Sequence, residues 1–182
     1  MKILIIIPAF NEEETLRGVI LSIRSSLSQA DILVVNDGST DSTANLARQE
    51  GVFVLEHPYN MGIGTTMQTG FLYAFRNGYD IAIQVDGDGQ HNPEFLPSLI
   101  KPLLAGQVNL VIGSRYLSDG GFKSTLLRKF GIKIFTCLVW IFTRKKATDP
   151  TSGFRAMDRK GLELFSEDYP SDYPEVEAFR SP

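Results

Sequence analysis

Apolar runs alternate with amphipathic stretches along the first two thirds of the chain. The continuous apolar run at residues 2–10 (KILIIIPAF) predicts a strand that is buried on both faces. Residues 11–27 then carry apolar side chains at helical spacing, with Glu12, Glu13 and Glu14 expected in the first turn, where the helix dipole favours acids. The same alternation predicts strands at 2–10, 31–39, 51–57, 80–89 and 109–116, and helices at 11–27, 40–49 (capped by Thr40 or Asp41), 60–78 and 92–106.

This strand-helix order predicts an α/β fold with a mostly parallel sheet and helices on both faces. Ligands of such sheets bind beyond the carboxyl ends of the strands. Asp37, Asp86 and Arg115 all fall at strand ends in this interpretation. Residues 148–159 are rich in turn formers, so a structured loop followed by a short helix is expected there.

Two carboxylates separated by one glycine, Asp86 and Asp88, follow the fourth predicted strand. Like charges this close need a positive partner. An EF-hand is excluded, because its sixth and twelfth positions would hold His91 and Pro97. Mg²⁺ or Mn²⁺ shared with substrate phosphates fits better, with Gln90 as a further oxygen ligand, although an ordinary acidic turn is the simpler alternative.

Two other segments are less specific. Asp37, in VVNDGSTDST (34–43), is either a turn former or an acceptor for a base N–H or a ribose hydroxyl. Residues 60–70 (NMGIGTTMQTG) lack the lysine of a phosphate-binding loop and predict a tight loop that begins a helix. His57 and His91 match no triad or metal spacing, so we expect surface or turn positions for both. A role at the edge of the site is the alternative for His91, which lies three residues after Asp88.

The charge is spread unevenly. The chain has a net charge of −3, yet one acid and eight basic residues lie between Arg115 and Lys146. Within that stretch, residues 122–146 mix bulky apolar and basic side chains, which suits a helix at a membrane interface. A helix packed on the sheet with extended lysines is the alternative. The single cysteine, Cys137, fits a reducing cytoplasm.

Taken together, these motifs resemble the family 2 glycosyltransferases of the GT-A fold, and most closely the dolichol-phosphate mannose synthase-like, polyprenyl-phosphate glycosyltransferase branch. The motifs lie in the family's order within residues 3–159: IIIPAFNEEETL, VVNDGSTDST, NMGIGTTMQTG, QVDGDGQHNPE, GSRY and DPTSGFRAMDR. Chains of this family usually continue beyond the acidic segment at 171–179. We expect residues 1–182 to form one catalytic domain. Because related chains continue further, truncation of this domain at its C-terminus is one expectation.

The resemblance implies a role for individual residues. Asp86, Asp88 and Gln90 match the metal-binding segment, and Asp88 is the expected catalytic carboxylate. Arg115 and Arg128 match the basic residues near the diphosphate and the acceptor phosphate, and Arg128 is expected to act in catalysis. Phe10 stands where the branch usually has tyrosine, so a hydroxyl contact is lost there. The expected nucleotide-sugar contacts are Pro8, Phe10, Glu12, Asp37, Asp86, Asp88 and Arg115.

The implied reaction is an inverting, metal-dependent transfer of a sugar from a nucleoside-diphosphate sugar to a polyprenyl phosphate, at the cytoplasmic face of a membrane. A lipid phosphate is already an anion, so arginines would orient it and no base would be needed. One alternative is transfer to a saccharide hydroxyl in cell-wall or surface polysaccharide synthesis, with Glu177 or Asp172 as the base. The other is a non-catalytic nucleotide-binding or scaffolding protein, and no nucleic-acid partner is expected.

Overall fold

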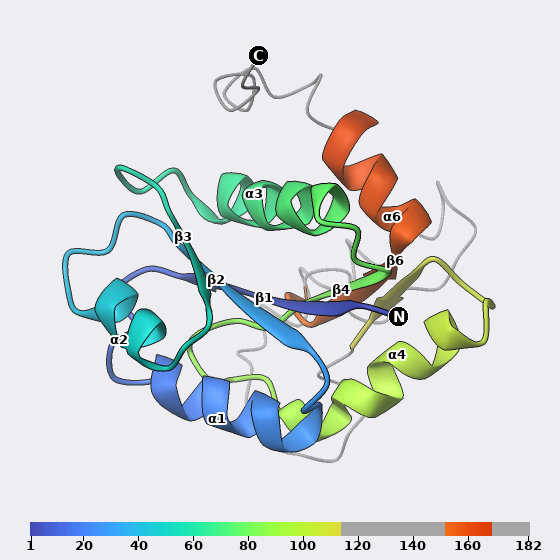
Figure 1. Ribbon diagram of the computed structural model, residues 1–182, viewed down its shortest axis with the longest axis horizontal. Coiled ribbons are helices and arrows are strands. Elements are labelled where there is room, and N and C mark those ends of the chain that lie inside the picture. The colour runs from blue at the N-terminus through green and yellow to red at the C-terminus, as the bar shows by residue number, and fades with distance from the viewer. Residues whose placement is uncertain (114–151, 169–182) are drawn as a thin grey trace, which may run out of the picture.

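The described residues form a six-stranded sheet with helices on both faces (Figure 1). The computed structural model describes residues 1–113 and 152–168. Its elements are β1 (Ile3–Ala9), α1 (Leu16–Ser26), β2 (Asp31–Asn36), α2 (Thr43–Gln49), β3 (Phe53–Glu56), α3 (Ile63–Arg76), β4 (Ile81–Gln84), η1 (Pro93–Phe95), α4 (Leu96–Leu104), β5 (Leu110–Ile112), β6 (Arg155–Asp158), α6 (Arg159–Glu163) and η2 (Leu164–Asp168).

The strand order is β3-β2-β1-β4-β6-β5. Strands β1, β2, β3 and β4 pair in parallel, whereas β6 is antiparallel to both β4 and β5. The predicted α/β fold with a mostly parallel sheet and helices on both faces is therefore confirmed.

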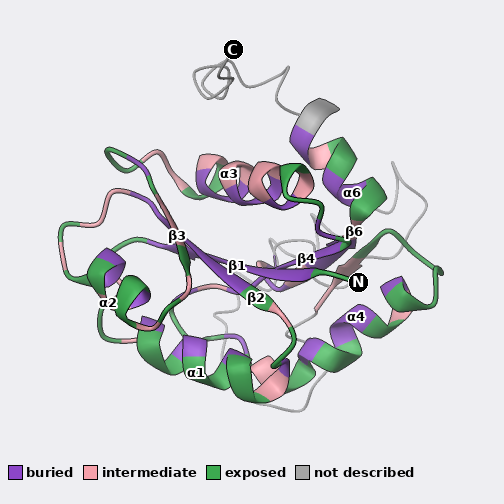
Figure 2. Cartoon of the chain, in the orientation of Figure 1, coloured by how far each residue is buried: buried purple, intermediate pink, exposed green. Residues whose placement is uncertain are grey.

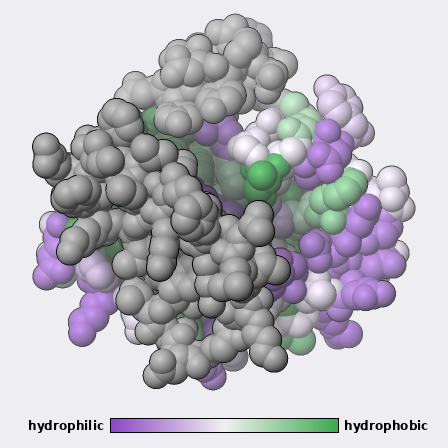
Figure 3. All heavy atoms as spheres, turned by 180° about the vertical axis from the view of Figure 1, so that it is seen from behind, coloured by the Kyte–Doolittle hydropathy of each residue, from purple (hydrophilic) through white to green (hydrophobic). Residues whose placement is uncertain are grey.

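Strand β1 forms the middle of the hydrophobic core, and all seven of its residues are buried (Figure 2). On one face of the sheet, α1 and α4 pack against Ile5 and Ile83; on the other, α3 and α6 pack against Leu4 and Ala82. A β-branched, uninterrupted apolar sequence is what a strand covered on both faces requires. Where the described residues are visible from behind, hydrophilic side chains lie at the surface among smaller apolar areas (Figure 3).

Three sequence predictions about local structure are wrong. Glu12, Glu13 and Glu14 precede α1, which begins at Leu16, because the chain first makes a turn after β1. The cap of α2 is Ser42 rather than Thr40 or Asp41, although the Asp41 carboxylate accepts the Thr43 N–H at 3.0 Å.

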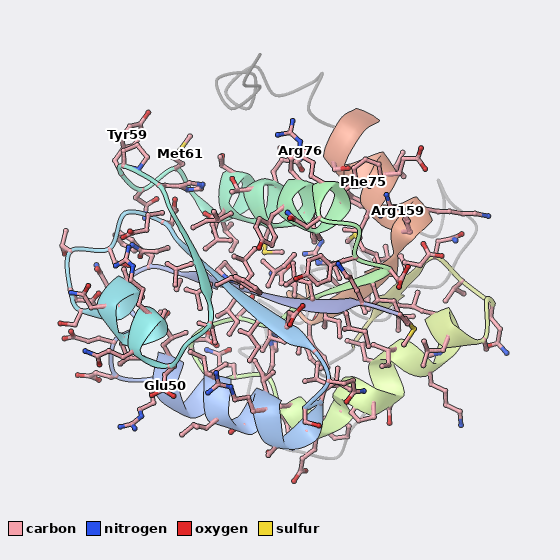
Figure 4. All side chains as sticks on the ribbon, in the orientation of Figure 1. Glu50, Tyr59, Met61, Phe75, Arg76 and Arg159 are labelled. Carbon is pink, nitrogen blue, oxygen red and sulfur yellow. The ribbon has the colours of Figure 1, made fainter. Side chains whose placement is uncertain are left out.

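The third wrong prediction concerns residues 155–158. They form strand β6 instead of a loop, and the short helix begins only at Arg159. Their strand character comes from pairing with β4 and β5, which are distant in sequence. At the start of α6, the guanidinium of Arg159 lies over the Phe75 ring at 4.8 Å and donates to the Tyr79 carbonyl oxygen at 3.3 Å (Figure 4). These contacts fasten the end of β6 to the end of α3.

Among residues 1–113 and 152–168, no helix is both long enough and apolar enough to cross a bilayer. The segment expected at the membrane, residues 122–146, lies outside the described residues.

Candidate functional site

A cleft of about 230 Å³ opens beyond the carboxyl ends of β1, β2 and β4. It is bounded on one side by the loop that leads into α3 and by the first turns of that helix. The position follows from the parallel sheet, whose strand ends meet at one edge. Its lining residues are Pro8, Ala9, Phe10, Glu12, Asp37, Asn60, Gly62, Ile63, Thr66, Asp86, Gly87 and Asp88.

Within the described part of the chain, all the residues that were predicted to contact the nucleotide sugar line this cleft. They are Pro8, Phe10, Glu12, Asp37, Asp86 and Asp88. Gln90, predicted as a metal ligand, does not line it; its side chain is exposed, and its backbone N–H donates to Asp88 Oδ1 at 2.9 Å. The predicted residues Arg115, Arg128 and Glu177 lie outside the described residues, as does Asp172.

The loop after β1 is held against the loop after β2. Asn11 adopts a left-handed backbone conformation (φ 55°), which asparagine tolerates better than most residues, and its Oδ1 accepts the Thr40 N–H at 2.9 Å. The Ser39 hydroxyl accepts the Asn11 N–H, and the Thr43 hydroxyl accepts the Glu12 N–H, both at 2.9 Å. These bonds fix the two loops on which Glu12 and Asp37 stand.

The segment with the paired carboxylates packs on the loop after β1. Thr15 Oγ1 lies 2.8 Å from both the Gly87 carbonyl oxygen and Glu12 Oε2. A β-carbon on Gly87 would lie 3.3 Å from the Pro8 carbonyl oxygen, so only glycine fits there without displacing its neighbours. This close approach brings Asp86 and Asp88 to the same cleft as Glu12.

The Asp86 carboxylate is fixed on several sides. Gln84 Nε2 donates to Asp86 Oδ1 at 3.0 Å, and His91 Nε2 lies 3.6 Å from Oδ2. His91 Nδ1 accepts the Asp86 backbone N–H at 3.2 Å, and its ring packs on Phe154 with 5.2 Å between centroids. Asp88 differs, because it is exposed at the cleft. The two carboxylates therefore have different surroundings.

Arg155 supplies positive charge behind Asp86. Burial lowers the pKa of Arg155, and the attraction of the Asp86 carboxylate opposes that shift. Arg155 pairs with Gln84 across β4 and β6. Within the described residues, Arg155 Nε and Gln84 Oε1 are buried without a hydrogen-bond partner.

Asp37 is also anchored, although it lies at the wall of the cleft. It is 4% exposed, and its carboxylate accepts hydrogen bonds from the side chain of His57 and the backbone N–H groups of Met61 and Gly62. Burial raises the pKa of Asp37, but these hydrogen bonds outweigh it and hold the pKa below the ordinary 3.8. Asp37 is therefore an anion at neutral pH.

The expected surface position is wrong for both histidines, whereas the alternative for His91, at the edge of the site, agrees with its contacts to Asp86. His57 is 5% exposed and His91 is 8% exposed, and each contacts an aspartate that lines the cleft. The contact of His57 is not readable from spacing, since it is 20 residues from Asp37 along the chain, whereas His91 is only five residues from Asp86. Gly153 and Arg155 were missed in the same way, because their approach to Asp86 depends on the pairing of β6 with β4.

The oxygen ligands at the cleft suit a hard divalent cation. Asp86 and Asp88 present carboxylates, which Mg²⁺ and Mn²⁺ prefer. Within the described residues, no group of three His, Cys, Asp or Glu side chains is arranged to hold a metal ion by itself. An ion held here would need further ligands from a substrate or from water.

Comparison with known proteins agrees with this geometry. The family model described as "Glycosyl transferase family 2" matches residues 4–165. The UDP-N-acetylglucosamine–dolichyl-phosphate N-acetylglucosaminyltransferase of Methanococcus voltae is 30% identical, over 91% of this chain and 72% of that protein. The polyprenol monophosphomannose synthase of Mycolicibacterium smegmatis is 34% identical, over 88% of this chain and 63% of that protein.

A solved structure is similar as well. Glucosyl-3-phosphoglycerate synthase from Mycobacterium tuberculosis, in complex with Mn²⁺, UDP-glucose and phosphoglyceric acid, gives a TM-score of 0.67 at 27% identity. The match covers 87% of this chain and 57% of that one. The chain thus spans less than two thirds of the length of the two mycobacterial proteins. By the extent of the family match, the chain belongs to glycosyl transferase family 2.

Proposed function

We propose that this chain transfers a sugar from a nucleoside-diphosphate sugar to a polyprenyl phosphate. The observation that carries the proposal is that Glu12, Asp37, Asp86 and Asp88 line the same cleft beyond the strand ends. Support for the acceptor comes from two relatives, whose names give dolichyl phosphate and a polyprenol monophosphate product. Support for the donor comes from the solved structure with UDP-glucose.

Asp86 and Asp88 are the proposed holders of a divalent ion, Mg²⁺ or Mn²⁺. The solved relative was crystallised with Mn²⁺ and UDP-glucose, which supports a divalent ion here. When bound, the ion would neutralise negative charge that develops on the departing nucleoside diphosphate. The exposed Asp88 is the proposed principal ligand, and Asp86, fixed by Gln84 and His91, the second. Gln90 remains a predicted ligand, although it does not line the cleft.

The remaining lining residues would orient the donor. Pro8 and the half-exposed Phe10 provide an apolar wall for the nucleoside, and ionised Asp37 can accept a hydrogen bond from the base or ribose. Membership of glycosyl transferase family 2 supports an inverting displacement, in which the acceptor would attack the anomeric carbon from the face opposite the departing diphosphate.

The acceptor side of the proposal concerns residues outside the described part of the chain. Arg115 and Arg128 are proposed to bind the lipid phosphate, since guanidinium groups pair with phosphate through two parallel hydrogen bonds. A phosphate acceptor is already charged, so these residues would position it rather than deprotonate it. The basic apolar segment 122–146 would hold the enzyme peripherally at the cytoplasmic face of the membrane.

A second candidate is transfer to a hydroxyl group of a soluble acceptor. The solved relative, a glucosyl-3-phosphoglycerate synthase with phosphoglyceric acid in its structure, favours keeping this candidate. A hydroxyl acceptor needs a general base, and Glu177 would take that role.

Both candidates are tested by one transfer assay. The chain is incubated with Mn²⁺ and radiolabelled UDP- or GDP-sugars, with undecaprenyl phosphate, dolichyl phosphate, phosphoglyceric acid or an oligosaccharide as acceptor. Label in the lipid phase that is abolished by chelator and by Arg128→Ala, but retained in Glu177→Gln, supports the lipid acceptor. Label in a soluble product that is lost in Glu177→Gln supports the hydroxyl acceptor. Metal-dependent nucleotide binding without transfer to any acceptor would contradict both.

A further inference from the structure

The Asp37 carboxylate is bonded asymmetrically by the loop that follows β3. Oδ1 lies 2.7 Å from His57 Nδ1 and accepts the Met61 N–H at 2.9 Å, whereas Oδ2 accepts the Gly62 N–H at 2.9 Å. A carboxylate oxygen accepts about two hydrogen bonds in its plane. Within the described residues, Oδ1 is therefore fully bonded, and Oδ2 keeps one acceptor position. Because Asp37 lines the cleft, that position is the part of the carboxylate left for a ligand.

The His57 ring is held at both nitrogens. An ionised carboxylate can only accept, so Nδ1 carries a proton and donates to Asp37. Nε2 lies 3.0 Å from the hydroxyl of Thr69, on α3. The ring is 5% exposed and bridges the end of β3 to that helix. Rotation of the ring would break both contacts, so the ring fixes the orientation of Oδ1.

The loop between His57 and α3 has little freedom to move away from Asp37. A β-carbon on Gly38 would lie 2.7 Å from the Asn60 backbone nitrogen, so the loop packs directly on the residue after Asp37. Figure 4 shows Tyr59 and Met61 on this loop, beside the first turn of α3. The carboxylate is thus held from one side by His57 and from the other by backbone N–H groups at the start of α3.

We propose that His57 is a positioning residue for the nucleoside half of the donor. Its hydrogen bond to Oδ1 fixes the orientation of the Asp37 carboxylate. In that orientation the remaining acceptor position of Oδ2 faces an N–H of the base or a hydroxyl of the ribose. This inference rests on the proposed function, since it assigns a nucleotide to the cleft. His57 does not touch the ligand in this scheme; it acts through Asp37.

Two substitutions of His57 separate its two contacts. The side-chain nitrogen of asparagine is joined to Cγ, as Nδ1 of histidine is, so His57→Asn keeps a donor for Asp37. The nitrogen of glutamine stands one bond further out, like Nε2, so His57→Gln keeps only a partner for Thr69. Titration of UDP and of GDP, each with Mn²⁺, measures the dissociation constant for both variants and the wild type. We expect a rise of about tenfold for His57→Gln, the scale of a hydrogen bond to a charged group, and less than threefold for His57→Asn.

A double-mutant cycle tests whether His57 acts through Asp37. In an Asp37→Asn background, His57→Gln should change the dissociation constant by less than twofold. An equal effect in both backgrounds would overturn the proposal, and so would equal affinities of His57→Asn and His57→Gln. If circular dichroism shows that His57→Gln is unfolded, Thr69→Val replaces it. That change releases Nε2 alone and should weaken binding about threefold; unchanged affinity would overturn the proposal.

The same titrations separate this inference from the proposed function. A wild-type chain that binds neither UDP nor GDP with Mn²⁺ overturns the proposed function and this inference together. A wild type that binds, with affinity unaltered by the His57 changes, overturns this inference alone.

Discussion

Gly153 lies directly against the carboxylate of Asp86. A β-carbon built on Gly153 would stand 2.8 Å from Asp86 Oδ1 and closer still to Oδ2. The contact exists because β6, which begins two residues after Gly153, pairs with β4, which ends two residues before Asp86. On another side of the carboxylate stands His91. The first aspartate of the pair is therefore shaped both by its own loop, through His91, and by Gly153, which is distant along the chain.

Gly153→Ala should displace the Asp86 carboxylate and weaken metal-dependent donor binding. We expect a loss of at least tenfold in the affinity for UDP or GDP measured with Mn²⁺, because a side chain at this distance from two oxygens forces one of them to move. Gly18→Ala is the matched control, since its β-carbon would meet no atom within 4 Å on exposed α1. The control should keep its affinity and gain about 0.5–1 kcal/mol of stability. Equal affinities of the two variants would contradict the contact.

Asp88→Asn should abolish the effect of Mn²⁺ on the affinity for the nucleotide sugar, without unfolding the protein. The side chain is exposed, and asparagine retains an oxygen that can accept the Gln90 N–H. Isothermal titration of a UDP- or GDP-sugar with and without Mn²⁺ should show at least a tenfold metal effect in the wild type and little in the variant. Glu94→Gln removes an exposed carboxylate outside the cleft and should behave as the wild type does. A metal effect that survives Asp88→Asn would remove Asp88 from the site.

The anchored Asp37 should contribute to stability in a defined pH range. Its pKa in the folded protein lies below 3.8, because the hydrogen bonds from His57, Met61 and Gly62 outweigh burial. A carboxyl group with a lowered folded pKa stabilises the fold above its unfolded pKa of about 3.9, and this contribution is lost as the pH falls through the folded value.

Urea denaturation of the wild type and of Asp37→Asn, at several values between pH 3 and pH 7, measures this contribution. The difference in the free energy of unfolding should be constant from about pH 5 to pH 7 and should shrink below about pH 4. If the difference in the free energy of unfolding stays constant down to pH 3, the partners of Asp37 do not lower its pKa.

The basic segment should bind anionic membranes if the proposed localisation holds. Changing Arg144, Lys145 and Lys146 together to glutamate should reduce cosedimentation with phosphatidylserine vesicles at least tenfold, since each basic residue near the surface contributes about 1 kcal/mol. Raising the salt concentration should reduce wild-type binding in the same direction. The control changes three exposed basic residues elsewhere to glutamate: Arg76, Lys101 and Lys160. This variant should bind the vesicles almost as the wild type does. Equal losses in both variants would indicate a nonspecific charge effect.

Much of the candidate site was predictable because it depends on position along strands. An uninterrupted run of apolar residues predicts a parallel strand. Because the carboxyl ends of parallel strands share one edge of the sheet, the polar residues that follow these runs must lie at that edge. Asp37 follows β2, and Asp86 and Asp88 follow β4, so their meeting in one cleft needed no knowledge of side-chain packing.

The supporting contacts were not predictable in this way. His57 was expected at the surface, yet it is buried against Asp37, because the loop into α3 folds back over Gly38. The RAMD segment of β6 carries no strong strand pattern of its own and becomes a strand only by pairing with β4. Glu12, Glu13 and Glu14 look like the start of a helix, but hydrogen bonds to the neighbouring loop keep them in a turn.

The sequence by itself determined the α/β class, the order of the first four strands and helices, and the set of acids at the strand ends. These follow from local periodicity and from the rule that parallel strands share one edge, which hold whatever the distant contacts are. Only the tertiary structure decided which groups surround each acid. Burial, hydrogen bonding and charge at Asp37 and Asp86 come from His57, His91, Gly153 and Arg155. The contacts of His57, Gly153 and Arg155 form only when segments distant in sequence pack together, and that of His91 depends on how the loop after β4 folds.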